Sequence, residues 1–243
     1  MSARIGVFAS GGGTNLQALL DHFNAGGGGG EGGGQGVGEV ALVVSDREEA
    51  GALARAARVG VATRVVPVKG RPPEDVAAET LAALDEADVE LIALAGYLRL
   101  VPAPVVAAYR WRMLNIHPAL LPAFGGKGMY GHRVHEAVLE AGCSLSGPTV
   151  HYVDERYDTG LILAQWPVPV VAGDTADTLA ARVLRVEHRL YPAVVERVAG
   201  SLQRSGGTVS AERLDTLFAL PDDTGFSLAG PPSVAEVRRA LGL

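Results

Sequence analysis

The sequence predicts an α/β fold with a Rossmann-like, mostly parallel sheet, helices on both faces, and antiparallel additions in the C-terminal half. Two observations predict this class. Short apolar runs alternate with segments that carry apolar residues at helical spacing, the pattern of parallel strands joined by right-handed helical crossovers. A run of glycines also follows the first apolar run and precedes the first helical segment, where a phosphate-binding turn would lie.

The N-terminal half opens with a strand at residues 4–9 and an amphipathic helix at residues 14–23. The further elements expected here are strands at residues 39–44, 61–66 and 89–95 and helices at residues 48–58 and 73–87. Residues 26–38 are almost wholly glycine and bury too little surface to offset their ordering entropy. We therefore expect a flexible surface loop at residues 26–38.

After residue 122 the alternation of apolar runs and helical segments ends, and a glycine-rich loop follows at residues 124–131. A long helix is expected at residues 174–199, with Asp174 or Thr175 as its N-cap. The other elements expected here are a helix at residues 134–141, strands at residues 149–153 and 162–170, a hairpin from residue 206 onward, and a helix at residues 234–241.

Composition narrows the functional class. The 243 residues carry a net charge of −6 without clustered Lys and Arg, which argues against a general nucleic-acid surface. No apolar run approaches the ~20 residues of a membrane span. Cys143 is the only cysteine, so no intramolecular disulfide can form and a reducing compartment is favoured. We expect a soluble, cytoplasmic protein without nucleic-acid or membrane partners.

The most informative stretch runs from Asn115 to Pro122. Asn115 and His117 are two residues apart, so an extended strand points both side chains to one face. Asp158 follows a second strand-like run and can approach the imidazole. An amide, an imidazole and a carboxylate together suit acyl-type transfer chemistry. Both this strand and the glycine turn end at the carboxyl edge of the predicted sheet, where they would share one cleft.

The glycine turn comprises Gly12, Gly13, Thr14 and Asn15. Unpaired N–H groups and the helix dipole at such a turn favour an anion, and glycine lets a phosphate approach the backbone. The turn is not a dinucleotide fingerprint, because Leu16 stands where the third glycine belongs. The residues alone leave a purely structural tight turn equally open.

His132 and His135 are three residues apart, the spacing of two ligands on one helix turn. One such pair without a cysteine partner is weak support for a metal. We interpret both as structural residues and expect no metal centre.

The spacing of Asn115, His117 and Asp158 resembles that of the folate-dependent formyltransferase family. Further segments agree with it at residues 10–16, 94–99, 187–188 and 191–192, so that the resemblance spans roughly residues 4–200. It implies the formyltransferase fold and transfer of the formyl group of 10-formyltetrahydrofolate to the amine of 5′-phosphoribosylglycinamide, a step of de novo purine (IMP) biosynthesis. It also implies that no metal is needed. A homodimer is possible.

The resemblance implies three domain parts. Residues 1–122 would be a phosphate-binding βαβ half, residues 123–205 the folate and catalytic half of the same domain, and residues 206–243 an extension. Asn115, His117 and Asp158 would be catalytic, with the Asn115 amide and a protonated His117 donating to the formyl oxygen. Asp158 would favour the imidazolium and help to remove the amine proton through water.

Binding roles follow from the same resemblance. The glycine turn would hold the ribose phosphate, and Glu187 the glycinamide end of the substrate. The residues implied at the folate are Arg71, Leu98, Arg99, Leu100, Val101, Asn115, His151 and Asp154. The match at Arg71 slips by about two residues.

Other functions share parts of this pattern. A formyltetrahydrofolate deformylase or a methionyl-tRNA formyltransferase would carry the same three catalytic residues. The first normally has an additional N-terminal domain, and the second a basic C-terminal RNA-binding domain, whereas the residues after 200 are few and acidic. A non-catalytic phosphometabolite-binding module is the third alternative, although a pure binder has no need of Asn115, His117 and Asp158.

Overall fold

The computed structural model describes residues 2–24 and 36–204. Most of the predicted glycine loop and the predicted C-terminal hairpin and helix lie outside these residues. Those predictions therefore stay untested.

A seven-stranded sheet forms the centre of the molecule, in the order β3-β2-β1-β4-β5-β7-β8. Its strands are β1 (Ala3–Phe8), β2 (Gly38–Ser45), β3 (Ala62–Val65), β4 (Leu91–Leu94), β5 (Met113–His117), β7 (Thr149–Tyr152) and β8 (Ile162–Gln165). The first five strands in this order pair in parallel, whereas β7 is antiparallel to both β5 and β8. The predicted mostly parallel sheet with antiparallel additions is confirmed.

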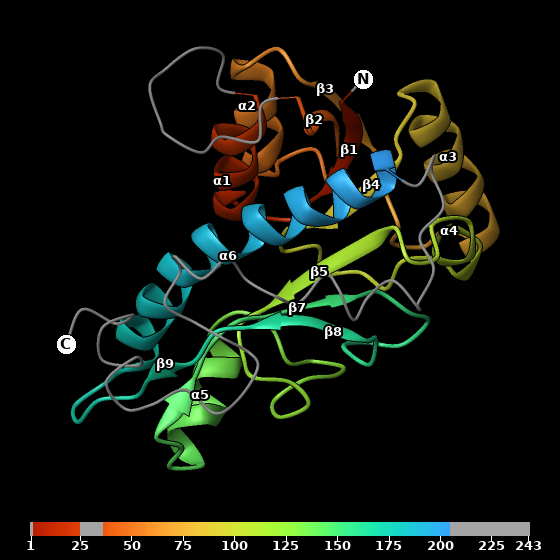
Figure 1. Ribbon diagram of the computed structural model, residues 1–243. Coiled ribbons are helices and arrows are strands. Elements are labelled where there is room, and N and C mark those ends of the chain that lie inside the picture. Colours follow the sequence, from red (N-terminus) through yellow and green to blue (C-terminus); the bar gives the residue numbers. More distant parts are fainter. Residues whose placement is uncertain (1, 25–35, 205–243) are drawn as a thin grey trace.

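Helices cover both faces of the sheet (Figure 1). They are α1 (Thr14–Phe23), α2 (Gly51–Arg58), α3 (Pro73–Glu86), α4 (Ala103–Ala108), α5 (His132–Glu140) and α6 (Ala176–Arg204). Strand β4 shows why two layers are needed: Leu91 and Ala93 pack with α1, α2 and α6, while Ile92 and Leu94 pack with α3 and α4. A parallel strand buried on both faces reads as a continuous apolar run, as this one does.

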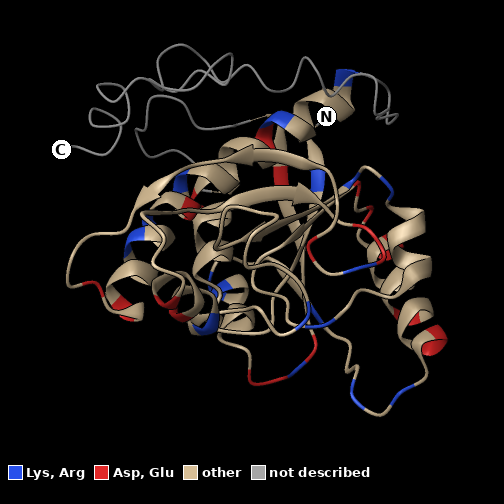
Figure 2. Ribbon diagram, turned by 90° about the horizontal axis from the view of Figure 1, so that it is seen from below, with Lys and Arg blue, Asp and Glu red and all other residues tan. Residues whose placement is uncertain are grey.

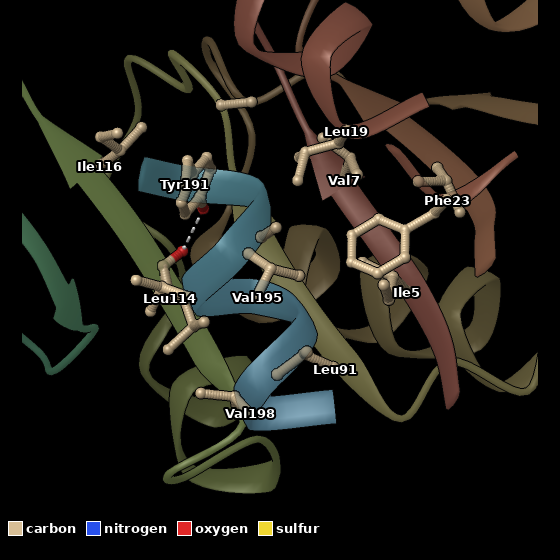
Figure 3. Packing of buried hydrophobic residues seen from close by; sticks show 14 of the residues in the cluster. Ile5, Val7, Leu19, Phe23, Leu91, Leu114, Ile116, Tyr191, Val195 and Val198 are labelled. Carbon is tan, nitrogen blue, oxygen red and sulfur yellow. Dashed lines mark hydrogen bonds between the residues drawn. The ribbon is translucent and has the colours of Figure 1, made fainter. Parts of the chain in front are cut away.

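Helix α6 lies along the sheet and is fixed to it by Tyr191 (Figures 1 and 3). The Tyr191 hydroxyl is fully buried and lies 2.9 Å from the Leu94 carbonyl oxygen and 3.1 Å from that of Leu114, at β4 and β5. Thr175 caps the helix, because its Oγ1 accepts from the N–H of Thr178 at 3.3 Å. One predicted N-cap is thus confirmed, and α6 carries Glu187 to the end of the sheet where β4 and β5 finish.

The predicted strand at residues 162–170 is wrong in its extent. Two strands replace it: β8 in the main sheet and β9 (Val168–Pro169), which pairs with β6 (Leu145–Ser146) in a separate two-stranded sheet. Pro167 stands between them and cannot donate to a ladder. The chain also passes so close to Gly147 that a Cβ there would lie 1.9 Å from the Trp166 carbonyl oxygen.

Other boundaries differ less. The short helix α4 was not predicted, and α6 continues beyond the predicted end at residue 199. The proposed division at residue 122 stays a prediction, since the sheet continues across it through the pairing of β5 with β7.

Charge is dispersed over the described surface. Lys and Arg segments are interspersed with Asp and Glu segments in the view of Figure 2. Among the described residues, no helix combines the length and the apolar character needed to cross a membrane.

Candidate active site

A cavity of about 580 Å³ opens at the carboxyl edge of β4 and β5. Its walls come from the segment after β4, the end of β5, the loop that leads into α5, the turn after β7, and α6. Asn15, at the start of α1, also lines it. The expected shared cleft at this edge is therefore present, and it draws on segments far apart in the sequence.

Strand register places the first three polar side chains of the cavity together. Asn115 on β5 lies directly opposite His151 on β7, and His117 follows Asn115 on the same face. The Asn115 amide nitrogen is 3.1 Å from Nε2 of His151. Nδ1 of His151 lies 2.8 Å from the Tyr152 carbonyl oxygen, so Nδ1 carries a proton. In the neutral ring, Nε2 then accepts from Asn115, which orients the amide.

His117 is buried, with 4% of its surface exposed. Its Nε2 lies 2.9 Å from the Phe124 carbonyl oxygen and therefore carries a proton, while Nδ1 faces Oδ2 of Asp158 at 3.6 Å. Burial lowers the pKa of His117 below its usual value of 6.5, and the nearby Asp158 carboxylate only partly opposes this. This lowered pKa favours a neutral ring in the resting site at neutral pH. The protonated His117 that the resemblance implies during the reaction stays a prediction.

Asp158 itself has a left-handed backbone conformation, with φ of 58°. The Gly126 N–H donates to its Oδ2 at 2.8 Å, and Nε2 of His151 lies 3.6 Å from Oδ1. Burial acts to raise the pKa of Asp158, but His151, His117 and the Gly126 N–H outweigh it and hold that pKa below the usual range. Asp158 is thus a carboxylate in contact with both imidazoles.

Asn15 and Glu187 also line the cavity. The Asn15 amide nitrogen donates to Oε2 of Glu187 at 2.6 Å, joining the glycine turn to α6. Glu187 is almost fully buried, and burial raises its pKa, with the Asn15 bond opposing. Oδ1 of Asn15 is buried and has no partner among the described residues.

Within the glycine turn, Gly13 is the residue directly before α1 and has φ of 74°. A Cβ on Gly13 would lie 2.8 Å from the Cα of Ala52 in α2, so only glycine fits. The first N–H groups of α1 have no partner inside the helix. Thr14 lines a neighbouring open groove between α1, α2 and α6 rather than the main cavity.

The predicted folate segment follows β4, where Leu98, Arg99, Leu100 and Val101 all line the cavity. Arg99 is fixed there, because its Nε donates to Oδ2 of the buried Asp46 at 2.8 Å. Its charge is thus already paired within the protein.

Asp154 also lines the cavity, in the turn that leads to Asp158. Its carboxylate accepts from Oγ1 of Thr159 at 2.8 Å and from the N–H of Arg156 at 3.0 Å. The side chain thereby shapes the turn after β7.

Arg71 is not brought to the cavity. Its Nη1 lies 2.6 Å from Oε2 of Glu79 and donates to the Pro67 carbonyl oxygen at 3.1 Å. The structure therefore does not support the predicted contact of Arg71 with the folate.

Several cavity residues were given no site role from the sequence, among them Tyr97, Met129 and His135. His135 is buried on α5, its Nδ1 has no partner among the described residues, and its pKa is lowered to about 4, first by burial and then by His132 and His117. A signal existed, since His135 lies three residues before Val138 and beside Val134, on the apolar side of the helix. No group of three or more His, Cys, Asp or Glu side chains in the described residues is placed to hold a metal ion.

Comparison with known proteins agrees with this geometry. A model of the family described as formyl transferase matches residues 3–195. The chain belongs to the formyl transferase family. A formyl transferase from Brucella melitensis, titled phosphoribosylglycinamide formyltransferase, has a crystal structure that is 46% identical with a TM-score of 0.71, over 82% of this chain and 96% of that one. Glycinamide ribonucleotide transformylase 1 from Symbiobacterium toebii is 41% identical with a TM-score of 0.72, over 82% of this chain and 89% of that one.

Curated formyl transferase relatives are longer than the match. The chloroplastic phosphoribosylglycinamide formyltransferase of Arabidopsis thaliana is 46% identical over 194 residues, which are 79% of this chain and 64% of the relative. The trifunctional purine biosynthetic protein adenosine-3 of Bos taurus is 37% identical over 84% of this chain and 19% of its own length. The chain thus spans under two thirds of these relatives.

Proposed function

We propose that this formyl transferase moves the formyl group of 10-formyltetrahydrofolate to the amine of 5′-phosphoribosylglycinamide, in purine biosynthesis. One observation carries the proposal: Asn115, His117 and Asp158 meet in a cavity that the Asn15–Glu187 pair closes on the side of the glycine turn. The phosphorylated amine would lie on that side, and the pterin of the folate along residues 98–101. The names of the relatives agree with phosphoribosylglycinamide as the acceptor of the formyl group.

The reaction forms a bond between the substrate amine and the formyl carbon and breaks the bond from that carbon to N10 of the folate. In the intermediate, the formyl oxygen carries negative charge and the attacking nitrogen positive charge. The second N–H of the Asn115 amide can donate to this oxygen, because His151 holds only the first. Asn115 therefore serves as an oxyanion donor.

His117 and Asp158 would carry out the proton transfer. Because Nε2 of His117 already donates to Phe124, the ring exchanges its proton at Nδ1. A neutral His117 can take the proton of the attacking amine, directly or through water, and Asp158 stabilises the imidazolium that forms. The imidazolium then donates to the formyl oxygen and returns the proton to N10 as the intermediate collapses.

Binding roles complete the proposal. The N–H groups of Gly12, Gly13, Thr14 and Asn15 would bind the ribose phosphate, and the carboxyl of Glu187 the glycinamide end. The apolar side chains of Leu98, Leu100 and Val101 and their backbone suit a pterin ring, which is flat and carries hydrogen-bonding edges. Arg71 takes no part.

The decisive experiment follows folate product with the purified protein and 10-formyltetrahydrofolate, with and without phosphoribosylglycinamide. We expect turnover that depends on the acceptor. Turnover without acceptor would indicate a deformylase, and binding of the phosphorylated substrate without turnover a non-catalytic binding module. Function in the cytoplasm stays a prediction, since the Arabidopsis relative is chloroplastic. The possible homodimer also stays a prediction, which sedimentation analysis can test.

A further inference from the structure

Helix α2 packs directly against the glycine turn. A Cβ added to Gly51 would lie 3.3 Å from the Cα of Gly12, and one added to Gly13 would lie 2.8 Å from the Cα of Ala52. A side chain at Gly13 is thus excluded, and one at Gly51 would be tightly packed. The turn and the first residues of α2 form a single packed unit.

Two carbonyl groups of the turn are held by donors from α2. The Ala52 N–H donates to the Gly11 carbonyl oxygen at 3.1 Å, and Nε of Arg55 donates to the Gly12 carbonyl oxygen at 2.7 Å. Nη1 of Arg55 also donates to Oε1 of Gln17 on α1 at 3.1 Å. The guanidinium therefore ties the turn to both helices.

The direction of these carbonyls sets the direction of the next N–H groups. Both peptide bonds are trans, so each N–H points opposite to the carbonyl of the preceding residue. With the carbonyls of Gly11 and Gly12 turned toward α2, the N–H groups of Gly12 and Gly13 turn away from it. No hydrogen bond in the described part of the chain uses either N–H as donor. Two oriented donors are thus left for an anion, beside the start of α1.

We propose that Arg55 is a positioning residue for the substrate phosphate. By fixing the Gly12 carbonyl, it aims the N–H of Gly13 at the phosphate without touching the reacting atoms. Arg55 is not part of the wall of the catalytic cavity and instead borders the open groove beside Thr14. The inference rests on the proposed function, because the phosphate is that of phosphoribosylglycinamide.

The test compares Arg55→Met with Arg58→Met in steady-state kinetics. Both variants remove one positive charge from α2, but within the described residues Arg58 donates only to the Ala54 carbonyl of its own helix. We expect Arg55→Met to raise the KM for phosphoribosylglycinamide roughly 10-fold, the scale of one hydrogen bond to a charged group. Its kcat at saturation and its KM for the folate should stay within about twofold of the parent. Arg58→Met should leave all three values near those of the parent.

Two further readouts separate positioning from other effects. The dissociation constant of ribose 5-phosphate, measured by calorimetry, should rise in Arg55→Met, whereas binding of the dephosphorylated ribonucleoside of the substrate should not change. In the ligand-free protein, NMR relaxation should show greater mobility of the Gly12 and Gly13 N–H groups in Arg55→Met. A direct charge contact with the phosphate would leave those free amides unaffected.

Several outcomes would overturn the inference. One is an unchanged KM for phosphoribosylglycinamide in Arg55→Met, and another is an equal rise of this KM in Arg58→Met. The others are an equal loss of affinity for the dephosphorylated ligand and unchanged mobility of the Gly12 and Gly13 N–H groups. If Arg55→Met does not fold, Arg55→Lys replaces it, since one ammonium cannot hold Gly12 and Gln17 together as the planar fork does; an unchanged KM there would equally overturn it. Failure of the proposed function is distinct, because the parent protein itself would then show no acceptor-dependent turnover.

Discussion

The glycine turn, which reaches the cavity through Asn15, and the β5–β7 strand pair supply different chemistry. The turn offers backbone N–H groups, whose direction is set by contacts with one neighbouring helix. The strand pair offers side chains, whose positions are set by the register of Asn115 against His151 and by the turn that carries Asp158. The first arrangement suits holding an anion that does not react, and the second suits moving protons and stabilising charge. Binding and chemistry should therefore fail separately when each region is changed.

The largest expected effect is on chemistry. We predict that His117→Ala and Asn115→Ala each lower kcat by roughly 10²-fold or more, the usual scale for loss of a general acid–base group or an oxyanion donor. Steady-state kinetics with both substrates measures this. His22→Ala is the matched control, because His22 lies outside the cavity and pairs with Glu196. A near-normal kcat in both variants would remove the catalytic assignment.

The next effect concerns the turn. Gly13→Val adds a side chain where φ is positive and where Ala52 lies 2.8 Å away, so we expect a stability loss of roughly 1–3 kcal/mol and much weaker binding of the phosphorylated substrate. Gly60→Val is the matched control, since Gly60 also has φ of 74° but an added Cβ meets nothing within 4 Å. Denaturant unfolding measures the loss of stability, and calorimetry with each ligand measures the loss of binding. Equal losses in both variants would mean that the contact with α2 is unimportant.

A smaller effect concerns pH. Because the lowered pKa of His117 keeps the ring neutral, kcat/KM should fall only as pH drops through a value below 6.5. Asp158→Asn removes the charge that raises this pKa, so the His117 titration should move to still lower pH. NMR titration of the His117 ring in parent and variant measures this directly. A shift to higher pH would show that Asp158 does not act on His117 as the geometry indicates.

The smallest effect is expected at Arg71. Its guanidinium is paired with Glu79 away from the cavity, so Arg71→Ala should change the KM for the folate by less than about threefold. A KM increase of tenfold or more would restore the folate contact implied by the family resemblance, and would require a movement of the residue on binding.

Much of the fold was predictable because its signals are local. The 3.6-residue period of Leu16, Leu19, Leu20 and Phe23 marks α1, and all four are buried there. The continuous apolar run of β4 requires cover on both faces, which two helical layers supply. The strand predicted at residues 162–170 failed, since the pattern of apolar residues does not show where a chain leaves one sheet for another.

The sequence by itself determined that Asn115 and His117 share a face, because that follows from the two-residue period of any strand. It also determined that a glycine turn precedes α1. Only the tertiary structure decided that His151 orients the Asn115 amide, that Asn15 meets Glu187, and that Arg55 holds the turn. Burial in the folded chain is also the main cause of the lowered pKa of His117. The physical reason is that hydrogen-bond partners far apart in the chain, and the water they exclude, are set by the packing of whole elements, which no local pattern specifies.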